Sequence, residues 1–155
     1  MQLDITHFCT TLVHDMADAV VYSNAEGQVR YWNRGTERIF GFSEPEALGQ
    51  SLDIIIPGNL RQRHWAGYDE TMRAGTTRYG AGDVVAVPAI RKGGSRLSVE
   101  LTILPFRDGT GAMVGVAAVL REVTQRFDET KRLRKGLREL KARADDRWRD
   151  RGSGI

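Results

Sequence analysis

Cysteine is nearly absent from this chain of 155 residues. Cys9 is the only one, so an internal disulfide and a multi-cysteine metal site are excluded. No apolar run approaches the ~20 residues of a membrane-spanning helix, and the N-terminus lacks a basic-then-apolar signal pattern. Histidine is also scarce: of three residues, only His64 lies outside the N-terminal region. These absences favour one cytoplasmic domain of ordinary globular composition, with no membrane contact by this segment.

The net charge of +3 is unevenly distributed along the chain. Residues 121–155 contain 12 Lys and Arg against 7 Asp and Glu, whereas residues 1–120 contain 11 against 13. The two signs alternate in the basic segment, as they do on a solvated helix, so we do not expect nucleic-acid binding.

The order of predicted elements indicates an α+β fold. Asn33 can cap a helix that ends at Gly41, because its side-chain oxygen can accept from the first turn and glycine tolerates the left-handed conformation. The expected helices are 4–17, 33–40, a short one opening at 43–46, and 57–75; the expected strands are 19–23, 28–32, 83–90, 95–106 and 112–123. This order predicts one five-stranded antiparallel sheet with short helices on one face, preceded by an N-terminal helix and followed by a linker helix.

His64 is the residue most informative about function. Ile56, Leu60, His64 and Gly67/Tyr68 follow at helical spacing, which places the imidazole on the apolar, inward side of its helix. An inward imidazole either forms hydrogen bonds inside a core or binds something held there. A neutral imidazole can coordinate a buried iron and leave the opposite position open to a diatomic gas.

The C-terminal segment has a weak heptad pattern. Thr130, Leu133, Leu137, Leu140 and Ala144 alternate spacings of three and four residues. We expect a connecting helix that pairs with its twin in a homodimer; the alternative is a solvated helix that packs on its own domain. The predicted division is a flanking helix at 1–17, a sensory domain at 18–124, a signalling helix at 125–150 and a disordered tail at 151–155.

Several turns and strand ends carry a family resemblance. They are Asp18–Gly27, Tyr31–Phe42, Glu46–Gly49, the Lys92-Gly93-Gly94 turn and the closing Glu122-Val123-Thr124. In this order they resemble the PAS domain family. The resemblance implies a PAS fold and a sensory domain in a signal-transduction protein, which passes its signal through the closing helix to a downstream output domain. The chain is therefore not expected to be an enzyme; any catalytic output lies outside it.

A more specific resemblance surrounds the histidine. Residues 55–57 (Ile-Ile-Pro), followed by Arg61–His64 and Tyr68, are similar to haem-binding PAS domains of the rhizobial oxygen-sensor kinase type. The resemblance implies that His64 is the proximal iron ligand of haem b and that the domain senses O2, CO, NO or redox state. The other residues expected around the haem are Leu60, Gly67, Tyr68, Leu101, Ile103 and Val116.

Two departures from that family pattern affect the specificity. The oxygen sensors place an arginine after the Gly-x-Gly that follows the helix, whereas Asp83 follows Gly80-Ala81-Gly82 here. Without that guanidinium the sequence does not choose among O2, CO and NO. Acidic residues also replace the family's propionate-binding basic residue, so Arg78 or Arg73 is the candidate for that role.

Two other interpretations remain open. In the first, the domain is a dimerisation module that is ligand-free or binds a small molecule, with His64 hydrogen-bonded in the core beside Tyr68. In the second, a flavin binds non-covalently, with Trp32 and Trp65 stacked on its ring; both indoles could equally be packing residues. The covalent flavin subtype is excluded because Cys9 precedes the core.

Overall fold

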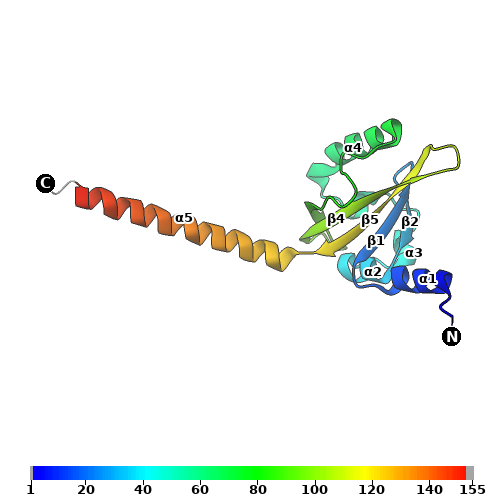
Figure 1. Cartoon of the computed structure of the whole chain (residues 1–155), viewed down its shortest axis with the longest axis horizontal. Helices are drawn as coiled ribbons and strands as arrows, with labels where there is room; N and C mark the ends of the chain where they lie inside the picture. Colours follow the sequence, from blue (N-terminus) through cyan, green and yellow to red (C-terminus); the bar gives the residue numbers. More distant parts are fainter. Residues whose placement is uncertain (1, 153–155) are drawn as a thin grey trace. The chain divides into compact units, whose positions relative to one another are not determined.

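The computed structural model describes residues 2–152, which divide into a unit ending at Glu122 and a unit starting at Val123. The elements are α1 (Ile5–Asp15), β1 (Ala19–Asn24), β2 (Val29–Trp32), α2 (Arg34–Phe40), α3 (Glu44–Ala47), the 3-10 helices η1 (Leu52–Ile54) and η2 (Gly58–Leu60), α4 (Arg61–Ala74), β3 (Val85–Ile90), β4 (Arg96–Arg107), β5 (Met113–Glu122) and α5 (Thr124–Gly152) (Figure 1). The predicted order of helices and strands is confirmed.

Side-chain caps explain where the helices start and stop. Asn33 accepts a hydrogen bond from the N–H of Thr36, and Gly41 ends α2 with a φ of 81°. Gly75 ends α4 in the same left-handed conformation, with a φ of 72°. Two predicted starts are wrong by a few residues. The segment from 57 opens as the 3-10 turn η2 before α4 begins, and β3 begins at Val85 because Asp83 closes a turn onto the N–H of Gly80.

The predicted five-stranded antiparallel sheet is confirmed, and within residues 2–152 its strands lie in the order β2-β1-β5-β4-β3. Val21 of β1 lies opposite Ala118 of β5, which lies opposite Ile103 of β4. Residues in direct register share one face of a sheet. This row is therefore part of a continuous apolar surface, which we call the inner face.

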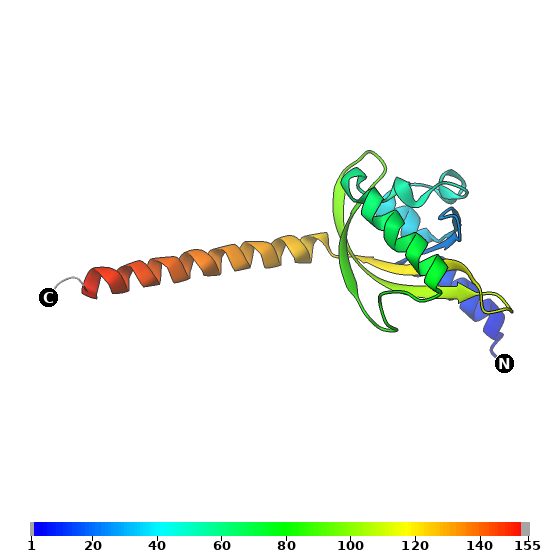
Figure 2. The same ribbon diagram turned by 90° about the horizontal axis from the view of Figure 1, so that it is seen from above.

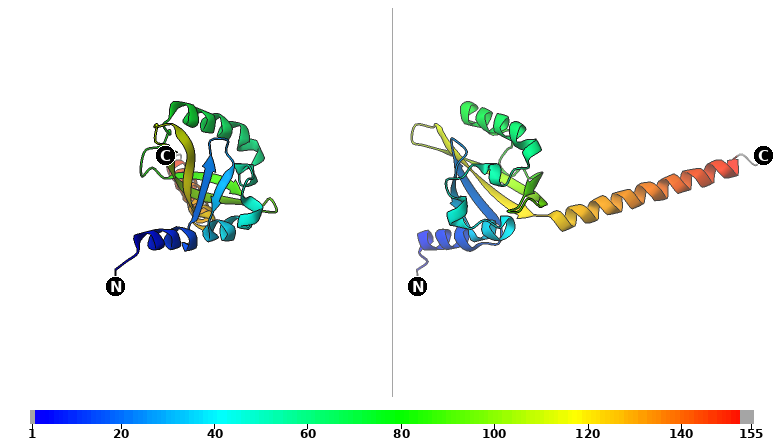
Figure 3. Two further views of the ribbon diagram at one scale, coloured as in Figure 1. Left: turned by 90° about the vertical axis from the view of Figure 1, so that its right-hand side faces the viewer. Right: turned by 180° about the vertical axis from the view of Figure 1, so that it is seen from behind.

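The helices cover the inner face and form the core with it. Phe40 of α2, Ala47 of α3 and Tyr68 of α4 are buried in one cluster with Val21 and Leu120 of the sheet. α4 lies over the strands, as two views of the ribbon show (Figures 2 and 3). The prediction that the helices pack on one face is confirmed.

Asn33 joins three elements at the start of the domain. Its fully buried amide oxygen accepts from the N–H of Val20 at 2.8 Å and from the N–H and hydroxyl of Thr36. Its amide nitrogen donates to the carbonyl oxygens of Val13 and Asp18 at 2.8 and 3.0 Å. One side chain thereby satisfies backbone groups from the end of α1, β1 and α2.

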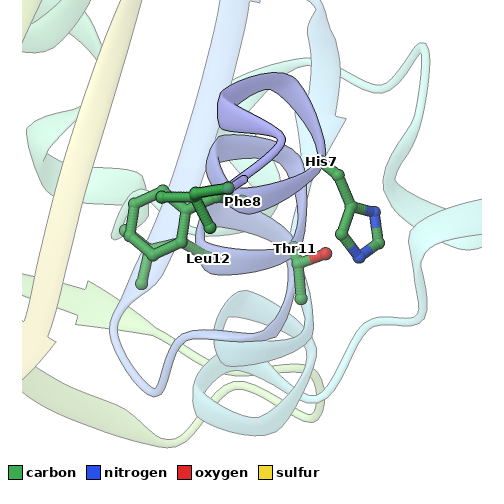
Figure 4. A pocket seen from close by; sticks show the side chains of 5 residues that line it. His7, Phe8, Thr11 and Leu12 are labelled. Carbon is green, nitrogen blue, oxygen red and sulfur yellow. The ribbon is translucent and has the colours of Figure 1, made fainter. Parts of the chain in front are cut away.

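Apolar side chains remain exposed outside the core. Leu104 and Phe106 of β4 are 51% and 48% exposed, and the Phe106 ring meets Tyr22 edge-on. α1 buries none of its residues. A shallow apolar pocket lies along α1, where Phe8 and Leu12 point to one side and His7 to another (Figure 4).

The second unit consists mainly of α5. The predicted helix from residue 125 is confirmed, and it extends through Gly152, two residues past the predicted end. The rest of the predicted disordered tail, residues 153–155, lies outside the described residues. Considered alone, α5 leaves Leu133, Leu137 and Leu140 exposed. No helix among residues 2–152 is long and apolar enough to cross a membrane.

Candidate ligand-binding site around His64

His64 lies in the first turns of α4, on the side of the helix that faces the core. The residue is half-buried, and its Nδ1 atom is buried with no hydrogen-bond partner among residues 2–152. Buried polar atoms in folded proteins nearly always have partners, so an orphaned imidazole nitrogen requires an explanation. Of the two expected roles, a hydrogen-bonded core residue or a ligand, the described residues provide no hydrogen-bond partner at Nδ1 for the first.

The surroundings of the ring are aromatic and favour its neutral form. The Trp65 ring meets the imidazole edge-on with centroids 4.9 Å apart, and the Tyr68 ring lies 5.9 Å away at a tilt of 35°. Burial lowers the pKa of His64, and the carboxylate of Asp53 partly opposes that shift. The ring is thereby kept in the neutral state that binds metals.

Tyr68 attaches α4 to the central strand β1. Its hydroxyl donates to the carbonyl oxygen of Asn24 at 2.5 Å and lies 2.9 Å from the hydroxyl of Ser23. Tyr68 and Ser23 are only 8% and 3% exposed, so these polar groups satisfy one another away from water.

Trp65 attaches α4 to two other segments of the chain, at Asp53 and Gly27. Its indole N–H donates to the Asp53 carboxylate at 2.8 Å. Its ring covers Gly27 so closely that a Cβ there would lie 2.2 Å from two ring atoms. Trp32 is 1% exposed and donates to the carbonyl oxygen of Phe42. Both indoles are thus packing residues, and Trp32 is not available to stack on a flavin ring.

The predicted lining residues occupy different places. Leu101, Ile103 and Val116 are half-buried on the inner face, in register rows with Leu120, Ala118 and Ser23 respectively. Leu60 is half-buried at the junction of η2 and α4. Arg78 is exposed in the loop between α4 and β3.

Gly67 does not join the residues that face the core. It is exposed, and a Cβ added to it would meet nothing within 4 Å. The helical spacing allowed either Gly67 or Tyr68 to follow His64 inward, and only Tyr68 does. Consecutive helical residues differ by about 100° around the axis, so both cannot occupy the same side.

The available donors restrict the kind of metal site. Among residues 2–152, no group of three or more His, Cys, Asp and Glu residues could hold a metal ion. A site based on His64 would therefore have at most two protein ligands of these types. Haem fits that limit because its porphyrin supplies four nitrogen ligands, whereas a bare metal ion does not fit.

The sequence of this chain matches a family whose fold agrees with the observed sheet and helices. Residues 13–128 match a family model described as the PAS fold. The chain belongs to the PAS family. PAS domains are sensory modules, and the helix-covered sheet of this chain is the PAS architecture.

Similar proteins extend the comparison. The sensor protein FixL of Bradyrhizobium diazoefficiens is 28% identical over 99 residues, which is 64% of this PAS chain and 19% of FixL. An uncharacterised protein of Azorhizobium caulinodans is 27% identical over 75% of this chain and 16% of its own length. The chain thus spans less than a fifth of these curated relatives.

Solved structures share the fold at low sequence identity. The PAS domain of a Colwellia psychrerythraea protein has a TM-score of 0.68 and 20% identity, covering 79% of this chain and 99% of that one. An RNA-binding light-oxygen-voltage receptor has a TM-score of 0.66 and 19% identity, covering 84% and 36%. At these identities the likeness concerns the fold alone.

Sequence reasoning missed three residues of this site: Ser23, Gly27 and Asp53. Ser23 could have been found, because alternation from Ala19 and Val21 puts a hydroxyl on the otherwise apolar inner face. No comparable local signal pairs Asp53 with Trp65 or places an indole on Gly27, because those contacts join segments that only the fold brings together.

Proposed function

We propose that this PAS domain is the sensory part of a cytoplasmic signal-transduction protein, binding haem b through His64 and responding to a diatomic gas or to redox state. The observation that carries the proposal is the buried, unpartnered Nδ1 of His64. An unsatisfied buried polar group costs about 1–3 kcal/mol, a cost that would be removed if the ring turned to bind a ligand through Nε2 and Nδ1 then gained a partner. The similarity to the sensor protein FixL supports a sensory role.

The residues around the imidazole suit a flat apolar cofactor. A half-turn about the Cβ–Cγ bond of His64 puts Nδ1 where Cδ2 lies and Nε2 where Cε1 lies, so the ring can turn its nitrogens toward other neighbours. Nε2 is the atom that would hold the iron. Leu101, Ile103 and Val116 provide half-buried apolar surface on the facing sheet. When bound, haem would supply an iron able to take a small gas. The Arg78 guanidinium, exposed in the α4–β3 loop, is the candidate partner for a propionate.

We further propose that the domain works as a homodimer through its flanking helices. α1 exposes Phe8 and Leu12 on one side, and α5 exposes three leucines at heptad spacing. Such seams are stabilised when two copies pair. Each unit would thereby contribute to an interface that passes a signal to an output domain beyond this chain.

A second candidate function is a PAS module that fills its own core and binds no cofactor. The hydrogen bonds of Tyr68 to Ser23 and Asn24 favour it, because they hold α4 against the sheet without any ligand. A non-covalent flavin has less support, since Trp32 is fully packed and the likeness to light-oxygen-voltage structures is one of fold.

An absorption titration with haem tests the choice between them. The purified chain should take up one haem and develop a Soret band that shifts when the reduced form is exposed to CO. His64→Ala should abolish haem retention while its circular dichroism stays unchanged. His14→Ala, which removes a half-exposed histidine of α1, is the matched control and should bind as the parent does. A parent chain that takes up no haem would leave the self-filled module as the function.

A further inference from the structure

Tyr68 follows His64 by one helical turn and connects α4 to the sheet. We propose that the hydrogen bonds of Tyr68 are the contact that transmits a change at position 64 to strands β1 and β5, which makes Tyr68 a positioning residue of the site. The proposal depends on the proposed function only in treating position 64 as the place where a ligand acts.

The first step is from His64 to Tyr68. Residues four apart on a helix are neighbours on one side, and here the two ring centroids are 5.9 Å apart. A ring at position 64 that moves, or that is replaced by a larger group, therefore pushes on the Tyr68 ring. Because Tyr68 is 8% exposed, that ring cannot move into solvent.

The second step is from Tyr68 to the central strands. The Tyr68 hydroxyl donates to the carbonyl oxygen of Asn24 and pairs with the hydroxyl of Ser23. Ser23 lies opposite Val116 in the β1–β5 register, and its Oγ is 3.5 Å from the Val116 carbonyl oxygen. β5 ends at Glu122, two residues before α5 begins in the chain.

The other polar attachments of α4 lead elsewhere. Among the described residues, the remaining side-chain hydrogen bonds donated by α4 end on residues 53–56 or within the helix itself. Arg107 of β4 reaches the carbonyl oxygen of Gly75, just past the helix end. Tyr68 therefore provides the hydrogen-bonded path from α4 to the β1–β5 pair.

Amide hydrogen exchange of β5 in the haem-free chain tests this path. The perturbation is His64→Phe, made in the parent, in Tyr68→Phe and in Tyr22→Phe. Tyr22 is the matched control: it is on β1, and its hydroxyl donates to the carbonyl oxygen of Val114 at 3.3 Å rather than to a partner on the inner face. Tyr68→Phe removes only the hydroxyl, so the ring contact with position 64 is kept.

We expect His64→Phe to change the exchange rates of β5 amides by about tenfold in the parent and in the Tyr22→Phe background. Losing one typical hydrogen bond changes an opening equilibrium by about that factor. In the Tyr68→Phe background the change should fall below about twofold. A purely structural role for Tyr68 would shift the baseline rates without removing the response to position 64.

Two results would overturn the proposal: an equal response in all three backgrounds, or no response in the parent. If Tyr68→Phe does not fold, Ser23→Ala replaces it. The bond from Tyr68 to the Asn24 carbonyl oxygen then remains, so the response of β5 should be reduced rather than lost, and an undiminished response overturns the step through Ser23. Haem titration reports separately on the proposed function. A chain that binds no haem but keeps the Tyr68-dependent response disproves haem binding and leaves the proposed path intact. A chain that binds haem but lacks the Tyr68-dependent response disproves the path and leaves haem binding intact.

Discussion

The pH dependence of unfolding tests the environment of His64 directly. Burial lowers the pKa of this imidazole, and the nearby Asp53 carboxylate only partly raises it again. In the unfolded chain the same ring titrates near the ordinary value of about 6.5. The two states therefore bind the proton at different pH values, and this difference becomes a dependence of stability on pH.

The sign follows from which state is protonated first. Above about pH 6.5 the ring is neutral in both states, and the contribution of His64 to the free energy of unfolding is fully present. As the pH falls below that value the unfolded chain takes up a proton before the folded chain does, so stability is lost until the folded pKa is passed. One proton sets the upper limit of the slope, about 1.4 kcal/mol per pH unit.

Urea unfolding of the haem-free parent and of His64→Gln between about pH 8 and about pH 5.5 measures that loss as a difference between the two proteins. NMR titration of the imidazole C–H signals gives the midpoint for His64 itself, assigned by its disappearance in the variant. Asp53→Asn keeps an acceptor for the Trp65 indole but removes the charge, so it should move the midpoint further down.

A midpoint for His64 at or above about 6.5 would refute the reasoning, because a ring desolvated by its surroundings cannot protonate as easily as one in water. A stability difference that stays constant over the pH range would lead to the same conclusion. Either result would mean that the imidazole is open to solvent and that its nitrogen is not orphaned.

Three further predictions concern the framework. Asn33→Ala should lower the free energy of unfolding by at least about 3 kcal/mol in urea, because it leaves several buried backbone groups without partners. Gly35→Ala should lower the free energy of unfolding by about 1–3 kcal/mol, since a Cβ there would lie 2.2 Å from the carbonyl oxygen of Asp18. The melting temperature should fall accordingly. Truncation after Thr124 should weaken self-association, and light scattering that shows an unchanged dimer would contradict it.

Local chemistry was enough to predict most of the framework. Asn33 as a cap and Gly41 as a stop placed α2 to within a residue, since caps are satisfied by neighbours in the chain. Alternating apolar residues placed the strands of the antiparallel sheet. Local signals failed at the start of β3, where Asp83 uses its carboxylate to close a turn rather than to extend a strand.

Some features of the candidate site were also predictable from the sequence and others were not. Helical spacing predicted that His64 and Tyr68 face inward, because that depends on one helix alone. It could not choose between Gly67 and Tyr68, nor say whether the imidazole finds a partner. Those outcomes depend on Ser23, Asn24 and the sheet.

The sequence by itself determined the elements, their order and the inward direction of His64, because helix periodicity, strand alternation and caps act between residues close in the chain. Only the tertiary structure decided that Nδ1 of His64 is buried unpaired while the Tyr68 hydroxyl is satisfied on β1. Hydrogen bonding and desolvation depend on groups that lie more than forty residues apart in sequence and meet only when the sheet and α4 pack together.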